Sequence, residues 1–220
     1  MKWTLLAAAA LLTACSNGQT NFSLSSLPGA SIIGAIRGGD RDHFATTEIE
    51  TPGFTAQAIA DNPENFMIVD VPNIGLNQPA RIVQKNGPDE TWAAQSGATF
   101  AFHDGVMVAT RGLIDDLLTL SGAGVRNALA AGGGTVTRTL ERLDDLDRLS
   151  TLVLTCTITG DGPEVVNLGL REAELAKFTE HCASPALVFD NAYWLDPEGR
   201  IIASRQLVSP GVGYARLNRL

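Results

Sequence analysis

Short runs of alternating apolar and polar residues, separated by turn sequences, place the strongest limit on how this chain can fold. The clearest example is segment 98–111, ATFAFHDGVMVATR, in which Phe100 and Phe102 alternate before Asp104-Gly105 and valines alternate after it. Asp-Gly between two alternating runs is typical of a type I′ hairpin, because both turn residues need positive φ. Repetition of such runs along the chain predicts many antiparallel strands and a mainly β fold with a few short helices.

Two further hairpins are predicted in the C-terminal half. The first covers residues 151–170, with leucines and Cys156 on one face, threonines on the other, and a turn at 160–163. The second covers residues 186–208 and turns at Asp-Pro-Glu-Gly, where proline pre-sets φ. Residues 214–220 are predicted as a final strand.

Several other segments have weaker patterns. Segment 112–120 has leucines at helical spacing and predicts a short helix or turn, whereas 132–134 is three glycines and predicts a flexible loop. Segment 172–182 fits the face of a helix and also fits a strand, and both readings stay open. The remaining weak predictions are a short helix at 31–36 and strands at 65–71, 81–85, 91–94 and 136–142.

The N-terminus has the three parts of a secretory lipoprotein signal. A short positive start with Lys2 precedes the apolar run 4–12, and Leu-Thr-Ala-Cys then resembles a lipobox that ends at Cys15. The apolar run is shorter than the roughly 20 residues of a membrane-spanning helix. We therefore expect residues 1–14 to be a cleaved signal peptide and Cys15 to carry lipid; an ordinary cleaved signal is the alternative.

The residues after Cys15 suggest how the protein is held. Ser16 stands where aspartate retains lipoproteins in the inner membrane, so we expect a lipid anchor in the outer membrane, on its periplasmic face. Small and polar residues make 15–27 a flexible tether. Residues 28–220 are then predicted to form a single β-rich periplasmic domain.

Two more cysteines, Cys156 and Cys182, fall within this domain. An exported protein lies in an oxidising compartment, which favours a disulfide between them. Cys156 points inward with its neighbouring leucines, so such a bond is expected to reach across the core. Two buried free thiols are the alternative.

Composition and motifs favour a noncatalytic protein. The chain has a net charge of −8 without a basic cluster in the sequence, which argues against nucleic acid as a partner. Its three histidines have no partners at metal-ligand spacing, and no nucleophile elbow or phosphate-binding loop is present. We therefore predict no metal, no cofactor and no catalytic residue.

Three motifs resemble the YjbF-like, or GfcB-like, lipoprotein family. Residues 108–117, VATRGLIDDL, resemble its arginine-glycine-leucine region. Residues 190–196, DNAYWLD, resemble its asparagine-x-tyrosine-tryptophan strand, and residues 204–210, SRQLVSP, resemble its serine-arginine-glutamine strand. The resemblance extends over residues 81–220 and the lipobox, and Leu207 stands where the family often has tryptophan.

The resemblance implies an antiparallel meander that curls into an open barrel or sandwich. It also implies a noncatalytic accessory role in exopolysaccharide or capsule secretion, with an outer-membrane β-barrel and periplasmic export proteins as partners. A periplasmic carbohydrate-binding or carbohydrate-modifying enzyme on a β scaffold is the alternative. An acidic polysaccharide is a further candidate partner, since arginine pairs with sugar carboxylates. The residues expected to contact glycan or partner are Trp92, Arg111, Tyr193, Trp194, Arg205 and Gln206.

Overall fold

The computed structural model describes residues 53–143, 146 and 148–220. The predicted signal peptide, Cys15, the tether at 15–27 and the short helix predicted at 31–36 lie outside these residues.

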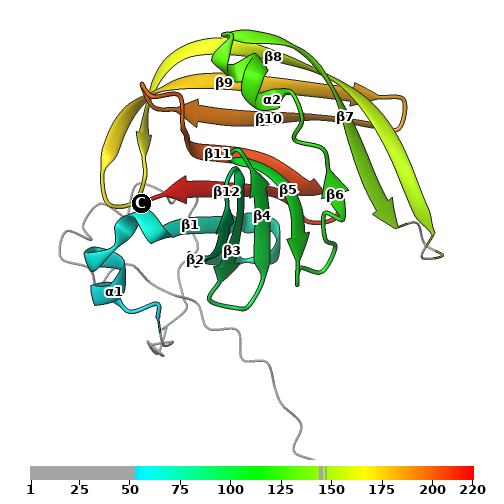
Figure 1. Ribbon diagram of the computed structural model, residues 1–220. Coiled ribbons are helices and arrows are strands. Elements are labelled where there is room, and N and C mark those ends of the chain that lie inside the picture. The colour runs from blue at the N-terminus through cyan, green and yellow to red at the C-terminus, as the bar shows by residue number, and fades with distance from the viewer. Residues whose placement is uncertain (1–52, 144–145, 147) are drawn as a thin grey trace, which may run out of the picture.

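Twelve antiparallel strands of the described part form one curved sheet (Figure 1). Two short α-helices and two 3₁₀ turns, η3 and η4, complete it. The elements are α1 Ala56–Asp61, η3 Pro63–Asn65, β1 Phe66–Val71, η4 Pro72–Ile74, β2 Leu76–Asn86, β3 Asp89–Ala94, β4 Thr99–His103, β5 Val106–Arg111, β6 Thr119–Leu120, α2 Val125–Ala130, β7 Gly133–Leu143, β8 Leu149–Asn167, β9 Glu172–Ser184, β10 Leu187–Leu195, β11 Ile201–Ser209 and β12 Gly213–Arg219.

The sheet is a meander that nearly closes on itself. From β1 to β5 and from β6 to β12 each strand pairs with the next one in the chain, and β1 pairs with β12 to join the two runs. The two free ends of the sheet, β5 and β6, meet at a seam where the Thr110 N–H donates to the Leu117 carbonyl at 3.0 Å. The mainly β, antiparallel fold curling into an open barrel is thus confirmed.

Two of the predicted hairpins form as expected. β4 and β5 turn at Asp104-Gly105, whose φ angles are 50° and 80°, as a type I′ turn requires. β10 and β11 form the hairpin around the Asp-Pro-Glu-Gly turn, and β12 is the predicted final strand.

The prediction of a hairpin turn at residues 160–163 is wrong. β8 continues through these residues with a bulge between Gly160 and Gly162, and the chain turns only after Asn167. Pairing of β8 with β7 ends at Thr159, so beyond it β8 has a neighbour on one side only. Proline is tolerated in such an edge position, which is why Pro163 stays within the strand.

The structure also decides the ambiguous segments. Residues 172–182 form most of β9 and are therefore a strand, while segment 112–120 consists of bends followed by β6 and is not helical. Two of the three glycines at 132–134 begin β7 instead of forming a loop. At Gly133 φ is 143° and an added Cβ would lie 2.9 Å from the Ile158 carbonyl oxygen, so only glycine fits there.

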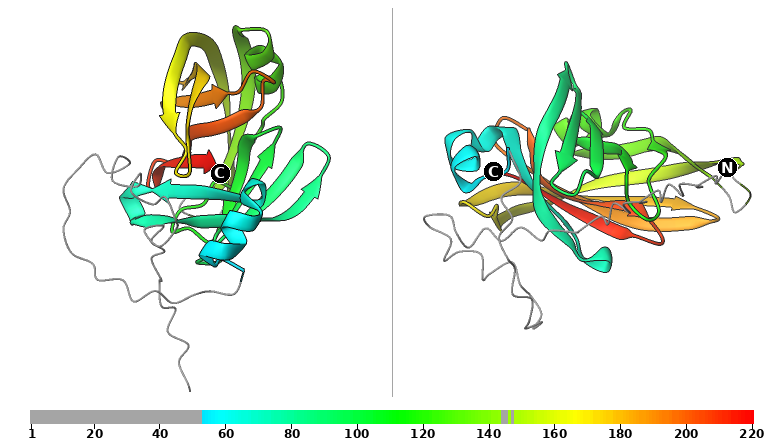
Figure 2. Two further views of the ribbon diagram at one scale, coloured as in Figure 1. Left: turned by 90° about the vertical axis from the view of Figure 1, so that its left-hand side faces the viewer. Right: turned by 90° about the horizontal axis from the view of Figure 1, so that it is seen from below.

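The core fills the inside of the curved sheet. A large hydrophobic cluster packs between the β1–β5 half and the β7–β12 half of the sheet. Figure 2 shows the curved sheet from two further sides. Helix α2, which local sequence patterns did not predict, covers one end of the interior. Its Val125 and Leu129 pack against Ile158, Tyr193 and other residues of a second cluster.

Cys156 and Cys182 form a disulfide, so the alternative of two free thiols is wrong. They are directly opposite each other in the neighbouring strands β8 and β9, with Cα atoms 4.0 Å apart. The bond therefore links adjacent strands and does not reach across the core. The sequence did not predict a bond between neighbouring strands, because the pattern of residues 172–182 fits a helix as well as a strand.

Candidate functional site

A buried ion pair lies at the centre of the barrel interior. Arg138 in β7 and Glu180 in β9 are both fully buried, and the Nη1 of Arg138 lies 3.0 and 3.2 Å from the two oxygens of Glu180. The Nε of Arg138 also donates to the Ser121 carbonyl at 2.6 Å. The Nη2 of Arg138 is buried without a hydrogen-bond partner, so the pair depends on the contacts of Nε and Nη1.

Two side chains of β10 complete the surroundings of Glu180. Asn191 donates its amide and Tyr193 its hydroxyl to the Glu180 carboxylate, at 2.8 and 2.7 Å. Burial, and then the negative charge of Glu180, raise the pKa of Tyr193 well above its ordinary value. The hydroxyl therefore stays protonated and remains a hydrogen-bond donor.

Gln206 in β11 connects this network to the opposite side of the barrel. Its amide oxygen accepts from the Met107 N–H of β5 at 2.9 Å, and its amide nitrogen donates to the Ser204 hydroxyl at 2.9 Å. The β10 and β11 motifs that resemble the YjbF-like proteins thus contribute Asn191, Tyr193, Ser204 and Gln206 to one buried network.

The network is suited to holding the fold together. The Glu180 carboxylate already accepts from Arg138, Asn191 and Tyr193 in an enclosed space, so no substrate reaches it in this conformation. Glu180 also lies close to Cys156 and Cys182, within the spacing of metal ligands. Because those two sulfurs are bonded to each other, neither is available as a thiolate ligand.

The third motif forms the seam between β5 and β6. Arg111 donates to the carbonyls of Leu117 and Leu118 at 3.1 and 3.2 Å. Asp116 accepts from the N–H groups of Gly112 and Leu113 at 2.9 and 3.2 Å. Arg111, predicted to contact glycan or partner, therefore has its guanidinium directed at the backbone of its own loop.

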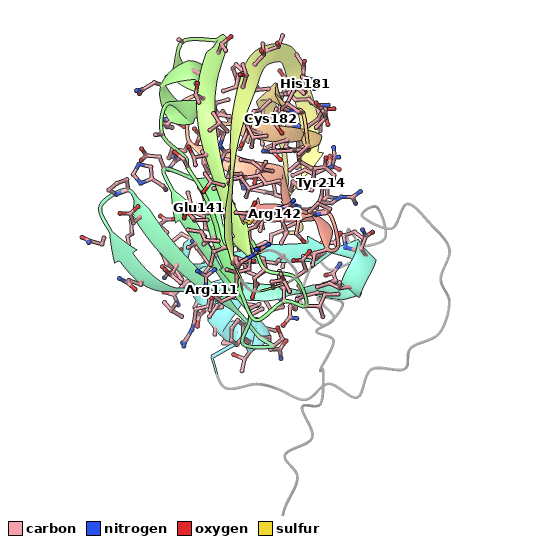
Figure 3. All side chains as sticks on the ribbon, turned by 90° about the vertical axis from the view of Figure 1, so that its right-hand side faces the viewer. Arg111, Glu141, Arg142, His181, Cys182 and Tyr214 are labelled. Atoms are coloured by element: carbon pink, nitrogen blue, oxygen red, sulfur yellow. A yellow bond between two sulfur atoms is a disulfide. The ribbon has the colours of Figure 1, made fainter. Side chains whose placement is uncertain are left out.

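A groove of about 800 Å³ opens beside this seam, at the end of the barrel where β11 finishes. Figure 3 shows Arg111 on one side of this region and Glu141 and Arg142 of β7 on the other. Its charged wall residues are two arginines and three acids, and its floor is apolar and buried. The floor residues are Leu117, Leu120, Leu140, Phe189, Leu207 and Val208.

Exposed apolar side chains surround the same groove. Ile114 is 81 % exposed and Leu143 is 52 % exposed, and both line it. Leu146 and Leu149, at the β7–β8 turn, are also exposed. Large apolar side chains gathered around a depression are typical of surfaces that dock a partner.

The other predicted contact residues lie away from the groove. Arg205 is on the outer face of the sheet, with its guanidinium 3.9 Å from the Tyr214 ring centre, and Trp194 stacks there with Lys177. Tyr193 and Gln206 are buried in the network described above. The six residues therefore do not form one site.

Trp92 is fully buried and takes part in a charged cluster of its own. Its indole N–H donates to Glu90 at 3.1 Å, and Arg219 lies over its ring while pairing with the same carboxylate. Burial alone would raise the pKa of Glu90, but hydrogen bonding and charge from Arg219, with help from Trp92 and Lys85, outweigh it and lower the pKa. Burial of Tyr193 and Gln206 in the network does not fit direct contact with a glycan.

His103 and His181 form surface pairs with carboxylates, and His43 lies outside the described residues. His103 lies 2.7 Å from Asp89, and His181 lies 2.6 Å from Asp190. Both pairs are exposed and neither lines the groove. Nothing in the described residues brings a histidine and a buried carboxylate together in a cleft, which is the arrangement expected of an acid–base site.

Residues 42–220 match the protein family described as "Group 4 capsule polysaccharide lipoprotein gfcB, YjbF". Among solved structures, the hypothetical lipoprotein YmcC of Escherichia coli K12 is similar, with 25 % identity and a TM-score of 0.63 over 74 % of this chain and 86 % of that one. A Bacteroides fragilis protein described as having a YmcC-like fold is 13 % identical, with a TM-score of 0.27 over 70 % of this chain and 93 % of its own. No curated protein sequence matches. Across the part of the chain that the structure describes, no helix has the length and apolar character needed to span a membrane.

Proposed function

Because the chain belongs to the YjbF family of group 4 capsule polysaccharide lipoproteins, we propose that it is a lipid-anchored accessory protein in the secretion or assembly of an exopolysaccharide or capsule. The observation that carries this proposal is the family match, which covers residues 42–220 and so nearly all of the predicted domain. Its proposed location is the periplasmic face of the outer membrane, held through lipid on Cys15.

The geometry favours a binding role over catalysis. The chemically useful groups of the buried network, Glu180 and Tyr193, are enclosed and hydrogen-bonded to one another. The open surface at the seam is instead a groove with an apolar floor and exposed Ile114 and Leu143 at its edge. Such a surface is suited to docking another protein.

The proposed partners are an outer-membrane β-barrel and periplasmic proteins of polysaccharide export. A lipid anchor confines the domain to the membrane face, and confinement raises the effective concentration of a partner in the same membrane. A weak contact through the groove is then sufficient for association.

A deletion strain tests the role. We expect loss of surface polysaccharide in the strain, recovery with the wild-type gene, and reduced recovery with Cys15→Ala, since that variant lacks the proposed lipid. The control is Ser16→Ala, which leaves the lipobox cysteine in place. Normal polysaccharide in the deletion strain would disprove the proposed function, and full recovery by Cys15→Ala would disprove the anchor.

Affinity purification of the full-length protein from envelopes tests the groove. Ile114→Glu puts a charge at the apolar edge and is expected to reduce recovery of the outer-membrane partner several-fold. Val153→Glu is the matched control, because Val153 is also exposed, at 62 %, but does not line the groove. Equal recovery with both variants would remove the groove from the proposal.

A further inference from the structure

A second cleft, of about 540 Å³, lies at the other end of the barrel from the groove. Ile201, at the start of β11, lines the cleft, and Ser209, at the end of the same strand, lines the groove. Eight residues of strand separate them, which corresponds to about 25 Å. Arg219, at the end of β12, lines the cleft, and Figure 1 shows that end of β12 beside the mark for the C-terminus.

Basic side chains from five separate parts of the fold meet at this cleft. They come from β2, α2, the β8–β9 turn, the β10–β11 turn and β12. These residues are Lys85, Arg126, Arg171, Arg200 and Arg219. They are five of the 16 lysines and arginines in a chain of net charge −8, so the cleft concentrates positive charge on an acidic protein.

Internal pairing neutralises three of these five basic residues. Glu90 pairs with Lys85 and Arg219, and Arg200 pairs with Asp196 at 2.7 Å and with Glu198 at 3.5 Å, two acids just outside the cleft. Three acidic residues in all line the cleft, against five basic ones. The groove at the opposite end has the reverse balance, with two basic and three acidic residues.

Arg126 and Arg171 are the two basic residues of the cleft that no such ion pair neutralises. Within residues 53–143, 146 and 148–220, neither has a carboxylate at ion-pair distance. The Nη1 of Arg126 is enclosed and has no hydrogen-bond acceptor, and its guanidinium lies against the Gly199 turn. A buried donor without an acceptor is costly, and a ligand oxygen would relieve that cost.

We infer that this cleft binds the carboxylate groups of an acidic polysaccharide, an inference that rests on the function proposed above. The guanidinium of arginine presents two parallel N–H groups that match the two oxygens of a carboxylate. Ile82, Pro88 and Ile201 line the cleft beside the arginines and offer apolar surface to the C–H faces of a sugar ring. Arg126 and Arg171 are the residues assigned to the carboxylates.

Calorimetric titration of the full-length chain with short oligomers of galacturonic acid and of sialic acid tests the inference. We expect at least one acidic oligomer to bind, binding to weaken as salt is raised, and neutral maltotetraose not to bind. Arg126→Ala/Arg171→Ala is expected to weaken binding about tenfold or more. Circular dichroism confirms that each variant is folded.

The matched control is Arg81→Ala/Arg216→Ala, which removes the same charge from residues that line neither the cleft nor the groove. It is expected to change affinity less than about twofold. No binding of either acidic oligomer, or equal loss in both double variants, would overturn the inference. Displacement of the oligomer by equimolar inorganic phosphate would also overturn it, because the cleft would then be a general anion site.

Polysaccharide secretion separates this inference from the proposed function. Complementing the deletion strain with Arg126→Ala/Arg171→Ala is expected to restore less surface polysaccharide than the wild-type gene does. If the deletion strain lacks polysaccharide but the variant restores it fully and binds oligomer normally, the cleft assignment fails while the accessory role stands. If the deletion strain secretes normally, the accessory role itself fails.

Discussion

At the scale of single residues, the Glu180 carboxylate is a buried charge that depends on its hydrogen-bond partners. It is fully buried, and its oxygens are held by Arg138, Asn191 and Tyr193. Bringing a charge into the interior costs several kcal/mol, which is offset only while its partners remain in place. Removing one partner therefore has a larger effect than removing an exposed pair of similar geometry.

Arg138→Met is expected to lower the free energy of unfolding by about 3–5 kcal/mol, because it leaves Glu180 charged and buried without its cation. Chemical denaturation followed by circular dichroism measures this. Arg142→Met, at an exposed position of the same strand, is the control and should change stability by less than about 0.5 kcal/mol. A loss under about 1 kcal/mol in Arg138→Met would mean that Glu180 does not depend on this pair.

The raised pKa of Tyr193 predicts that the folded protein loses stability at alkaline pH. Its pKa is raised in the folded state by burial and by Glu180, so the folded state holds the proton while the unfolded state releases it. The stability that protonated Tyr193 gives the folded state is fully present below the ordinary pKa of 10.0, and it is lost as the pH rises from there toward the raised pKa of the folded state.

Unfolding free energies measured between pH 8 and 11 should fall above about pH 10 in the wild type, and fall less steeply in Tyr193→Phe. The phenylalanine variant is less stable at neutral pH because it loses the hydrogen bond to Glu180, so the comparison is between slopes. Identical slopes in the two proteins would contradict the assignment.

At the scale of elements, β8 and β9 form the longest hairpin and extend beyond their neighbours. β7 stops pairing with β8 at Thr159, while β8 and β9 remain paired as far as Asn167 and Glu172. The Cys156–Cys182 bond lies in the part of the hairpin that has neighbours on both sides. It therefore fixes the register of the two strands beside the core.

Cys156→Ser/Cys182→Ser is expected to lower the free energy of unfolding by about 3 kcal/mol, since the bond closes a loop between residues 26 apart in sequence. Wild-type protein unfolded in the presence of a reductant is the control and should lose a similar amount. A double variant as stable as the oxidised wild type would show that packing alone fixes the register.

At the seam between β5 and β6, Arg111 stabilises the contact by donating to the carbonyls of Leu117 and Leu118. Arg111→Met is expected to raise hydrogen exchange of the Thr110 and Leu117 amides roughly five- to tenfold, because hydrogen bonds from a charged donor are lost. Exchange in β10, measured in the same sample, should be unchanged. A uniform increase over the whole sheet would instead indicate global destabilisation.

Local patterns predicted the elements well where the chain turns in a standard way. Asp104-Gly105 has a sequence that specifies its turn, and the hairpin around it forms as predicted. Gly160–Pro163 has turn-like residues, yet β9 continues to pair across it, so tertiary pairing overrides the local signal. The segment at 172–182 was ambiguous because its apolar positions shift face at the bulge opposite Gly160.

At the scale of the whole molecule, the pairing of β1 with β12 decides the shape. Met67 lies opposite Arg219, and Leu220 packs with Phe54 and Phe66 in one cluster. No local pattern predicts that contact, because it joins the two ends of the described chain. The sequence did not predict the basic cleft either, since its arginines come from separate elements and form no run in the sequence.

Because the two ends of the described chain lie together, a circular permutant is expected to fold. A short Gly-Ser linker from Leu220 to Gly53, with new ends opened between β7 and β8, keeps every strand pair. We expect the wild-type circular dichroism spectrum and a bonded Cys156–Cys182 pair. A second permutant opened within β11 is the control and should not fold, because that strand has neighbours on both sides.

The pairing of β12 with β1 also determines when the sheet can close during synthesis. β1 is among the first parts to be synthesised, but its partner follows some 150 residues later, so one edge of β1 stays open while almost all of the chain is made. Open strand edges invite pairing with other chains, so a chain in this state is prone to aggregate unless a chaperone protects it. A polypeptide released before β12 is made carries unpaired edges on β1 and β11, and is therefore a substrate for proteases and not a shorter working protein.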